Sequence, residues 1–344
     1  MESSVAGELK KDAILLGIET SCDETAAAVV RNGRQVLSST LVSQIDLHKQ
    51  FGGVVPEVAA RRHVELLNEV VSKALADACI KPSDLSGIVC TAGPGLIGTL
   101  LVGLSAAKAL SWGWDVPLIT VDHLFAHVCA NYIDTDLEPP FIALLVSGGH
   151  TQILYFENYQ TGRILGQTID DAVGEAFDKV GRLLGLPYPG GPLIDKLSRE
   201  GDPRAFPFPE GVVADYGFSF SGLKTAVLRC VEKLPAPLPV ADLAASFQSA
   251  VVKVLVKKTL LAQQEFNAPH IVLAGGVAAN SQLRRQLQES SPVPVLFPPS
   301  KYCTDNAAMV GAAGYFFGRP ASMNVQAYSR TKPKRPSRTK ATRV

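Results

Sequence analysis

The sequence has few of the residues and patterns that mark secreted or membrane proteins. Only six of its 344 residues are cysteines, and no two of them form a CxxC pair. This spread is typical of reduced, buried thiols and argues against a disulfide framework. No apolar run reaches the roughly 20 residues that a membrane-spanning helix needs. The first residues include acids and lack a basic segment followed by an apolar run, so we expect no signal peptide and a cytoplasmic protein.

Three common functional motifs are also missing. The P-loop pattern GxxxxGK followed by Ser or Thr does not occur, and neither does the dinucleotide-binding pattern GxGxxG. The residue after His123 is a leucine, which excludes the HExxH motif of metalloproteases. P-loop, Rossmann and zinc-protease sites are therefore unsupported.

Strong charge of one sign is absent from the body of the chain but present at its end. The formal net charge is +1. Residues 330–344 contain seven basic side chains and no acid, which leaves 26 basic against 32 acidic side chains elsewhere. We expect this segment to be a flexible basic tail that either contacts nucleic-acid phosphates or aids solubility.

Each half of the chain begins with a pattern typical of a β-hairpin. The first consists of the apolar run AILLGIE, the polar turn TSCDET and the run AAAVV, which ends at Asn32-Gly33. The second, from Phe141 to Phe156, consists of FIALLV, the turn SGGHT and QILYF. With the length of the chain, this recurrence predicts two duplicated domains with a cleft between them.

Helix-like and strand-like segments alternate along the rest of the chain. Apolar residues at helical spacing mark RRHVELLNEVVSKALADA, LLVGLSAAKALSW, DDAVGEAFDKVGRLLGL, a segment from Leu193, and residues 241–267. The segments GIVCTAG, PLITV and HIVLAGGVAAN are typical of strands, and CTDNAAMVGAAGYFF is typical of a closing helix. The alternation predicts an α/β protein with mixed sheets.

The stretch VDHLFAH places His123 and His127 four residues apart. Asp122, a preferred N-cap residue, precedes them, so we expect a helix that presents both imidazoles on one face. Two imidazoles need only one carboxylate to form an open iron site or a catalytic zinc site. From the spacing alone, two core-facing or rim histidines are the commoner explanation. On the same grounds Asp305, near the start of the closing helix, is a first-turn acid that the helix dipole favours.

Three glycine-rich turns lie in the second half: VSGGH (146–150), YPGGP (188–192) and AGGVAAN (274–280). Paired glycines let the backbone approach a ligand closely, and successive N–H groups can form a nest for an anion. The three turns together predict a nucleotide pocket, although each alone is also typical of an ordinary turn. Acids cluster in the first hairpin turn at Glu19, Asp23 and Glu24.

Nine longer blocks make the pattern specific, because they occur here in one order. They are GIETSCDETAAAVV, VPEVAARRH, GPGLIGTLLVG, DHLFAH, LVSGGHT, GEAFDKVGRLLGLPYPGGP, FSFSGLKTA, LAGGVAAN and CTDNAAM. Together, from about Leu15 to about Tyr315, they closely resemble the bacterial TsaD family. Its members are the tRNA N6-adenosine threonylcarbamoyltransferases, formerly named O-sialoglycoprotein endopeptidases.

The resemblance implies an actin-like ATPase (ASKHA) fold of two duplicated α/β domains with mixed sheets and an interdomain cleft. On this basis we expect one domain over residues 12–122 plus the C-terminal helix near 306–318, and a second over 123–305. The basic flexible tail over 330–344, predicted from its charge, lies outside the resemblance. The implied reaction moves a threonylcarbamoyl group from threonylcarbamoyl-AMP to N6 of the adenosine 3′ of the anticodon, in tRNAs that read codons beginning with A. The implied partners are TsaB-like and TsaE-like companions and an upstream threonylcarbamoyl-AMP synthase, with no membrane.

The matching motifs also imply roles for individual residues. The implied ligands of one divalent metal per subunit, with Fe²⁺ favoured and Zn²⁺ as the alternative, are His123, His127 and Asp305. The residues expected on the phosphate side of the adenylate are Val146, Ser147, Gly148, Gly149 and His150. Those expected around its ribose and base are Asp178, Gly191, Asp195 and Asn280. Glu24 is the expected catalytic or positioning acid.

Two alternatives keep the fold and change the function. One is a sugar-kinase-like or acetate-kinase-like phosphotransferase, because one fold hosts many functions. Such kinases hold Mg²⁺ through carboxylates and phosphates, so the histidine pair argues against them. The other is a non-catalytic scaffold like TsaB, which lacks the histidine pair. The older peptidase assignment rests on the two histidines alone.

Overall fold

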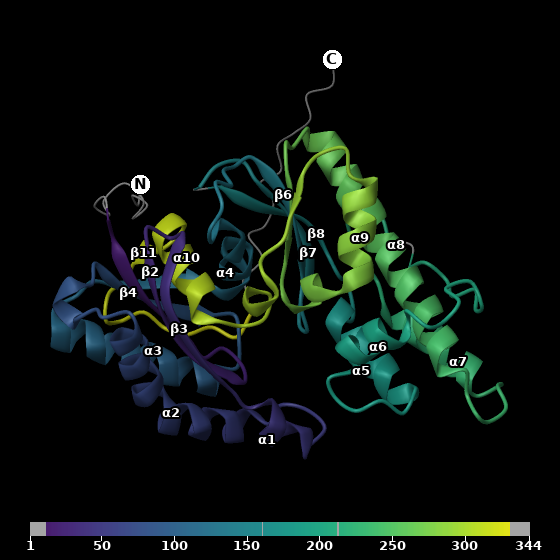
Figure 1. Cartoon of the computed structure of the whole chain (residues 1–344), viewed down its shortest axis with the longest axis horizontal. Helices are drawn as coiled ribbons and strands as arrows, with labels where there is room; N and C mark the ends of the chain where they lie inside the picture. Colours follow the sequence, from purple (N-terminus) through teal and green to yellow (C-terminus); the bar gives the residue numbers. More distant parts are fainter. Residues whose placement is uncertain (1–11, 160, 212, 331–344) are drawn as a thin grey trace.

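The computed structural model describes residues 12–159, 161–211 and 213–330, which form two β-sheets with helices packed on their faces (Figure 1). The predicted basic tail lies outside these residues except for Arg330. Within the described ranges, no helix is both long enough and apolar enough to cross a membrane.

The first sheet has six strands in the order β11-β5-β4-β1-β2-β3. The strands β1, β2 and β3 form an antiparallel meander, β4 pairs parallel to β1, and β5 pairs parallel to β4. The short β11 closes the edge antiparallel to β5. Their bounds are β1 Ile14–Glu19, β2 Glu24–Arg31, β3 Gln35–Ser43, β4 Gly87–Gly93, β5 Leu118–Asp122 and β11 Arg319–Pro320.

The second sheet repeats this topology with five strands in the order β10-β9-β6-β7-β8. Again a three-strand antiparallel meander is extended by two parallel strands. Their bounds are β6 Phe141–Val146, β7 Thr151–Phe156, β8 Gly162–Gln167, β9 Ile271–Ala274 and β10 Val295–Leu296. The two predicted hairpins are thus β1-β2 and β6-β7, and the mixed α/β architecture is confirmed.

Helices divide the buried apolar residues into three clusters. One face of the first sheet packs against α2 and α3, and one face of the second sheet packs against α5 to α9. The remaining cluster joins both sheets through α4 and α10. The helix bounds are α1 Ile45–Lys49, α2 Pro56–Asp77, α3 Ile97–Trp114, α4 His123–Cys129, α5 Val173–Leu183, α6 Gly190–Leu197, α7 Ser221–Val231, α8 Val240–Phe266, α9 Ser281–Ser290 and α10 Ala307–Phe316. Four 3₁₀ turns are η2 Pro82–Asp84, η3 Ala130–Tyr132, η4 Gly276–Ala279 and η5 Ser300–Tyr302.

Two predicted element boundaries were wrong. The helix expected from Leu193 begins at Gly190, because the Asp178 carboxylate accepts a hydrogen bond from the Gly190 N–H at 2.8 Å and so satisfies the first free amide of α6. The strand expected through Asn280 ends at Ala274. Gly275 turns the chain with a φ of +89°, and a Cβ there would lie 2.4 Å from the Val146 carbonyl oxygen.

Candidate active site

The helix α4 brings His123 and His127 together at the end of β5. Asp122 is its N-cap, as predicted, and the Asp122 Oδ1 accepts hydrogen bonds from the backbone N–H groups of Leu124 at 2.9 Å and Phe125 at 3.3 Å. This cap begins the helix at His123, so both histidines fall in its first two turns. Their ring centroids are 4.7 Å apart.

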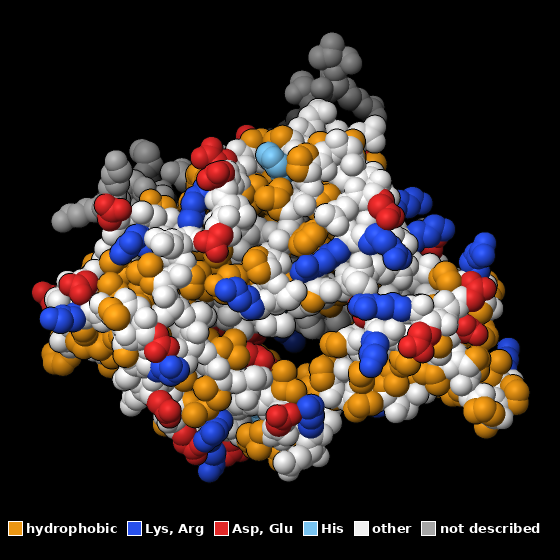
Figure 2. All heavy atoms as spheres, in the orientation of Figure 1, with side chains coloured by type: hydrophobic (Ala, Val, Ile, Leu, Met, Phe, Trp, Pro, Cys, Tyr) orange, Lys and Arg blue, Asp and Glu red, His pale blue; other side chains and the backbone are white. Residues whose placement is uncertain are grey.

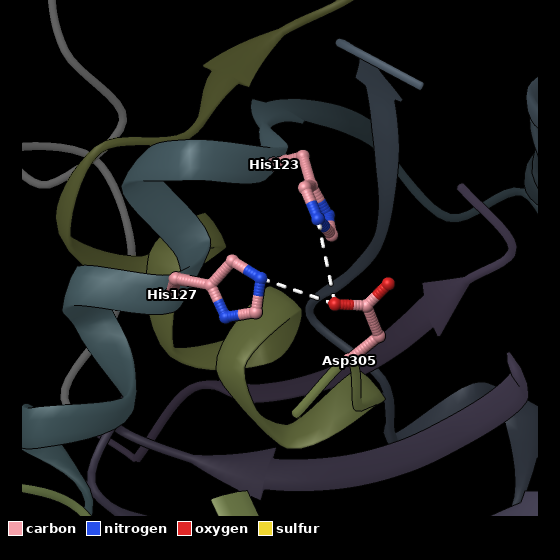
Figure 3. A group of neighbouring side chains, drawn as sticks. All are labelled: His123, His127 and Asp305. Carbon is pink, nitrogen blue, oxygen red and sulfur yellow. Dashed lines mark ion pairs between the residues drawn. The ribbon is translucent and has the colours of Figure 1, made fainter. Parts of the chain in front are cut away.

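Asp305 meets the two imidazoles from a distant part of the chain. Its Oδ1 lies 3.1 Å from His127 Nε2 and 3.5 Å from His123 Nε2, as Figure 3 shows. One ligand atom from each residue lies within 4.8 Å of the other two. The prediction that Asp305 is a first-turn acid was wrong, because α10 begins only at Ala307 and Asn306 caps it. Asp305 instead stands in the loop before the helix, with its side chain turned toward α4.

His123, His127 and Asp305, here called the trio, interact strongly through their charges. Burial alone would raise the pKa of Asp305, but the two histidines outweigh it and hold this pKa below the usual range of a carboxyl group. Burial would likewise lower the pKa of His123, but Asp305 and Glu19 raise it to about 9. Without a metal, the attraction between the Asp305 carboxylate and the nearby imidazoles therefore holds these groups together.

The donor set fits a divalent metal. Both ring nitrogens of His127 are buried, and neither makes a hydrogen bond of good geometry within the described residues. Nitrogen atoms left in this state cost free energy unless another partner satisfies them. Two imidazoles and one carboxylate would satisfy iron or zinc and leave open positions for water or substrate.

Glu19 orients His123, a role that the sequence did not reveal. The Oε2 of Glu19 lies 3.1 Å from His123 Nδ1, and the Ser21 hydroxyl lies 3.2 Å from the same nitrogen. Glu19 is itself fixed by hydrogen bonds from the Thr91 hydroxyl at 2.7 Å and from the Ser21 N–H at 2.6 Å. A proton on Nδ1 leaves Nε2, the nitrogen that faces Asp305, free to bind a metal. The only sequence signal was the place of Glu19 at the end of β1 beside an acidic turn.

Glu24 lies in the same turn, at the start of β2, and is buried. Burial, Asp305 and Asp23 raise the pKa of Glu24 to about 10, although a hydrogen bond from the Ser43 hydroxyl at 3.1 Å acts against this shift. In the metal-free protein Glu24 is therefore a neutral carboxyl group at pH 7. This state suits a hydrogen-bond donor better than a general base.

The turn between β6 and β7 is exposed, whereas the turn between β1 and β2 is largely buried. Gly148 and Gly149 are exposed, and a Cβ added at either would meet no atom within 4 Å. Their backbone N–H groups donate to no group in the described part of the chain. The helix α5 begins beside this turn, where the Gly174 N–H donates to the Ser147 carbonyl at 3.2 Å. Free amides near a helix N-terminus suit an anion.

His150 connects this turn to the metal-ligand trio electrostatically. Burial and the nearby His123 and His127 lower the pKa of His150 to about 4, so its ring is neutral at pH 7. Val146, at the other end of the turn, is fully buried at the end of β6. The predicted segment from Val146 to His150 therefore contributes open backbone and one neutral imidazole.

The four residues predicted around the ribose and base fall into two groups. Asp178 and Gly191 lie at the contact of α5 with α6, where burial raises the pKa of Asp178. Asp195 and Asn280 share a buried network through Gln248, which donates to Asp195 at 3.2 Å and accepts from Asn280 at 2.7 Å. Asn280 also caps α9. The network shows that both side chains have structural partners, and their contact with a ligand remains a prediction.

A hollow separates the two halves, and acidic side chains stand at its rim in Figure 2. Tyr188 lies close enough to carboxyl groups of both halves for their charges to affect its pKa. Burial, Asp178 of the second half and Asp23 of the first raise the pKa of its hydroxyl to about 12. The acidic turn and the α5-α6 region therefore face one another.

The TsaD family model, described as tRNA N6-adenosine threonylcarbamoyltransferase, matches residues 35–312. The chain belongs to the TsaD family. Two bacterial proteins named tRNA N6-adenosine threonylcarbamoyltransferase illustrate the similarity. The one from Thermosipho africanus is 55% identical over 309 residues, covering 88% of this chain and 93% of the relative. The one from Moorella thermoacetica is 52% identical over 318 residues, covering 90% and 93%.

Solved structures confirm the fold of this TsaD family member. T. kodakarensis HypF matches with a TM-score of 0.63 at 16% identity, over 89% of this chain and 48% of HypF, so the chain spans about half of that protein. Component A of the Acidaminococcus fermentans (R)-2-hydroxyglutaryl-CoA dehydratase matches with a TM-score of 0.51 at 14% identity, over 88% and 98%. At these identities the likeness shows the fold alone, which is the predicted actin-like ATPase fold.

Proposed function

We propose that this chain transfers a threonylcarbamoyl group from threonylcarbamoyl-AMP to N6 of the adenosine 3′ of the anticodon, in tRNAs that read codons beginning with A. Membership of the TsaD family supports the reaction class. The observation that supports the chemistry is the convergence of His123, His127 and Asp305 beside a turn of free backbone amides. The histidine pair also disfavours a kinase that binds Mg²⁺ through carboxylates.

The reaction would form one bond and break one. The N6 amine attacks the carbamoyl carbonyl carbon, the bond from that carbon to the phosphate oxygen breaks to release AMP, and the N6 proton passes to solvent water. Backbone N–H groups of Gly148 and Gly149 would bind the departing phosphate, with the N-terminus of α5 adding a favourable dipole. Glu24, beside the proposed metal ligands, would be the catalytic or positioning acid. Asp178, Gly191, Asp195 and Asn280 would line the ribose and base of the donor.

The three ligands would hold one divalent metal, for which we favour Fe²⁺ over Zn²⁺. Such an ion supplies Lewis-acid polarisation of a carbonyl group or an anchor for a carboxylate. Glu19 and Ser21 would keep His123 in the orientation and tautomer that binding requires.

We also propose the remaining features that the sequence and its family resemblance predict. The domains would comprise residues 12–122 with the helix near 306–318, and residues 123–305. Companions like TsaB and TsaE would assist the chain, a separate synthase would supply the donor, and the reaction would take place in the cytoplasm. The basic tail over 330–344 would contribute to tRNA binding at low salt.

Nucleoside mass spectrometry tests the proposed reaction. Unmodified tRNA is incubated with the donor, the companions and either the native chain, His123→Ala or His270→Ala. His270 lies before β9, outside the trio, and serves as the matched control. We expect N6-threonylcarbamoyladenosine with the native and His270→Ala proteins and a loss of at least a hundredfold with His123→Ala. Equal product from all three would contradict the role of the trio.

A further inference from the structure

Residues 44–55, here called the strap, run from the end of β3 through α1 to the start of α2. The strap begins at the acidic turn, where the Gln44 N–H donates to the Asp23 carbonyl at 3.0 Å. The buried His48 holds its far end, because its Nδ1 accepts from the Val55 N–H at 3.3 Å and its carbonyl from the Gly53 N–H at 3.4 Å. Hydrogen bonds therefore fix the strap at both of its ends, and its first end lies beside Glu24.

The tip of the strap reaches the other half of the molecule. The Arg182 guanidinium, in the last turn of α5, donates to the Gly52 carbonyl at 3.3 Å. In Figure 1 the strap, with α1, lies below the gap between the two halves. It therefore borders the hollow of Figure 2 and connects the turn that carries Glu24 with the helix that carries Asp178.

Phe51 is the unusual residue of the strap, because 57% of its surface is exposed. Among the exposed large apolar side chains of the described residues, only Phe51 and Trp112 are aromatic. Next to Phe51, a Cβ added at Gly52 or Gly53 would meet no atom within 4 Å, so this part of the loop is open. Lys49, half exposed, lies on the same loop, where it pairs with the exposed Asp46 at 2.7 Å.

These features fit an unpaired RNA base better than a protein surface. Protein interfaces usually bury about 800 Å² on each partner around an apolar centre. Phe51 instead stands between the exposed Gln50 and the two glycines. The other large exposed apolar side chains of the described residues are spread along the chain, at Leu41, Val64, Ile97, Leu101, Trp112, Ile164, Ile169, Leu261 and Met323. Recognition of single-stranded RNA relies on aromatic rings that stack on splayed bases, with cations nearby for phosphates.

We infer that the strap is an RNA-binding element, in which Phe51 stacks on an unpaired base of the anticodon loop next to the target adenosine. The inference rests on the proposed function and adds the residue that positions the acceptor. Stacking at Phe51 would place the RNA loop at the rim of the hollow. Lys49 and Arg182 would lie near its phosphates.

The test compares the full chain with Phe51→Ala, Phe51→Leu, Phe51→Trp and the control Trp112→Ala, which removes an aromatic that is 82% exposed on α3. Fluorescence anisotropy measures the Kd for an unmodified anticodon stem-loop, and nucleoside mass spectrometry with the companions measures KM for tRNA and kcat. We expect Phe51→Ala and Phe51→Leu to raise Kd and KM about ten- to a hundredfold, as the loss of one base stack predicts. Phe51→Trp and Trp112→Ala should stay within about threefold of the native chain.

Each contrary result has its own meaning. A Kd for Phe51→Ala equal to that of the native chain would overturn the inference. So would a Kd for Phe51→Leu as low as that for Phe51→Trp, because apolar bulk without a stacking face would then suffice. A loss of companion binding in the absence of RNA, with Kd unchanged, would make the strap a protein interface instead. Absence of product from the native chain would count against the proposed function, while anisotropy would still decide the role of Phe51.

Discussion

The two hairpin turns, between β1 and β2 and between β6 and β7, occupy equivalent places in the duplicated sheets but differ in burial and in hydrogen bonding. The turn between β1 and β2 is largely buried, and its carboxyl groups at Glu19 and Glu24 are held by hydrogen bonds. The turn between β6 and β7 exposes Gly148 and Gly149, whose amides have no partner in the described structure. One topology thus supplies a hydrogen-bonded support for the proposed metal ligands on one side and an open backbone surface for the proposed anion site on the other.

The difference shows how a duplicated fold can acquire an asymmetric site. The acidic turn does not itself supply the predicted metal ligands. It orients His123 through Glu19, while α4 and the loop before α10 contribute the ligand atoms. The glycine turn needs no side chain for its proposed role, because its binding groups are backbone N–H groups.

Removal of His127 should have the largest effect. Its imidazole is almost fully buried and its Nε2 lies 3.1 Å from Asp305 Oδ1, so His127→Ala removes a proposed ligand together with a close partner of the Asp305 carboxylate. We expect loss of bound metal and a fall in transfer of about a hundredfold or more. Elemental analysis and nucleoside mass spectrometry measure the two effects. Retention of stoichiometric metal would contradict the assignment.

Glu19→Gln should weaken the same site indirectly. The substitution keeps the shape of Glu19 but removes the charge next to His123 Nδ1. Loss of such an orienting partner typically lowers metal affinity ten- to a hundredfold. A competition titration with a metal chelator measures this change, with Glu57→Gln, an exposed acid on α2, as the control. Equal affinity of the two variants would show that the acidic turn does not support the site.

Two glycine substitutions separate binding from folding in the second turn. Gly149→Ala meets open space, so we expect an unchanged Tm and a donor Kd about tenfold weaker because the added methyl hinders close approach of the phosphate. Gly275→Ala combines a φ of +89° with a 2.4 Å contact to the Val146 carbonyl and should lower Tm by several degrees. Calorimetry and donor titration check both. A Tm loss in Gly149→Ala would mean that the turn is structural.

Metal affinity should rise with pH. His123 has a pKa of about 9 in the metal-free protein, so below that value a metal must displace a proton. We expect affinity to increase by up to about tenfold for each pH unit from 7 toward 9 and then to level off. Chelator titrations at several pH values measure the slope. A flat profile over this range would show that His123 is already neutral.

The smallest expected effect is a stability gain in Glu24→Gln. The unfolded chain releases the Glu24 proton near pH 4, whereas the folded metal-free protein holds it to about pH 10, so this group lowers stability as pH rises between these values. In chelator-treated protein at pH 7.5 the variant should melt roughly 2–4 °C higher, and at pH 4 the difference should vanish. A lower Tm at pH 7.5 would mean that Glu24 is charged in the fold.

The features that could be predicted from the sequence depend on local spacing. His123 and His127 are four residues apart and follow Asp122. This spacing was enough to predict a capped helix with both imidazoles on one face. Apolar runs on either side of a polar turn were enough to predict both hairpins, β1-β2 and β6-β7. Asp305 could not be placed from spacing, because its approach to α4 depends on the packing of α10 against both sheets.

Other features escaped prediction for the same reason. The contact of Glu19 with His123 joins positions 104 residues apart, and the start of α6 depends on the Asp178 carboxylate of another helix. The proximity of His150 to the trio arises only when the two sheets pack together. In each case the partner lies on another element, and no local pattern marks the contact.

The most direct test is a single-turnover assay of metal-stripped protein reloaded with graded amounts of Fe²⁺ or Zn²⁺. Nucleoside mass spectrometry measures the threonylcarbamoyladenosine formed from the preformed donor, and elemental analysis measures bound metal. If the trio is the reaction centre, product should rise linearly with metal and stop at one equivalent per chain, and His127→Ala should form none at any loading. Full product from the metal-free native chain would contradict a metal centre at His123, His127 and Asp305.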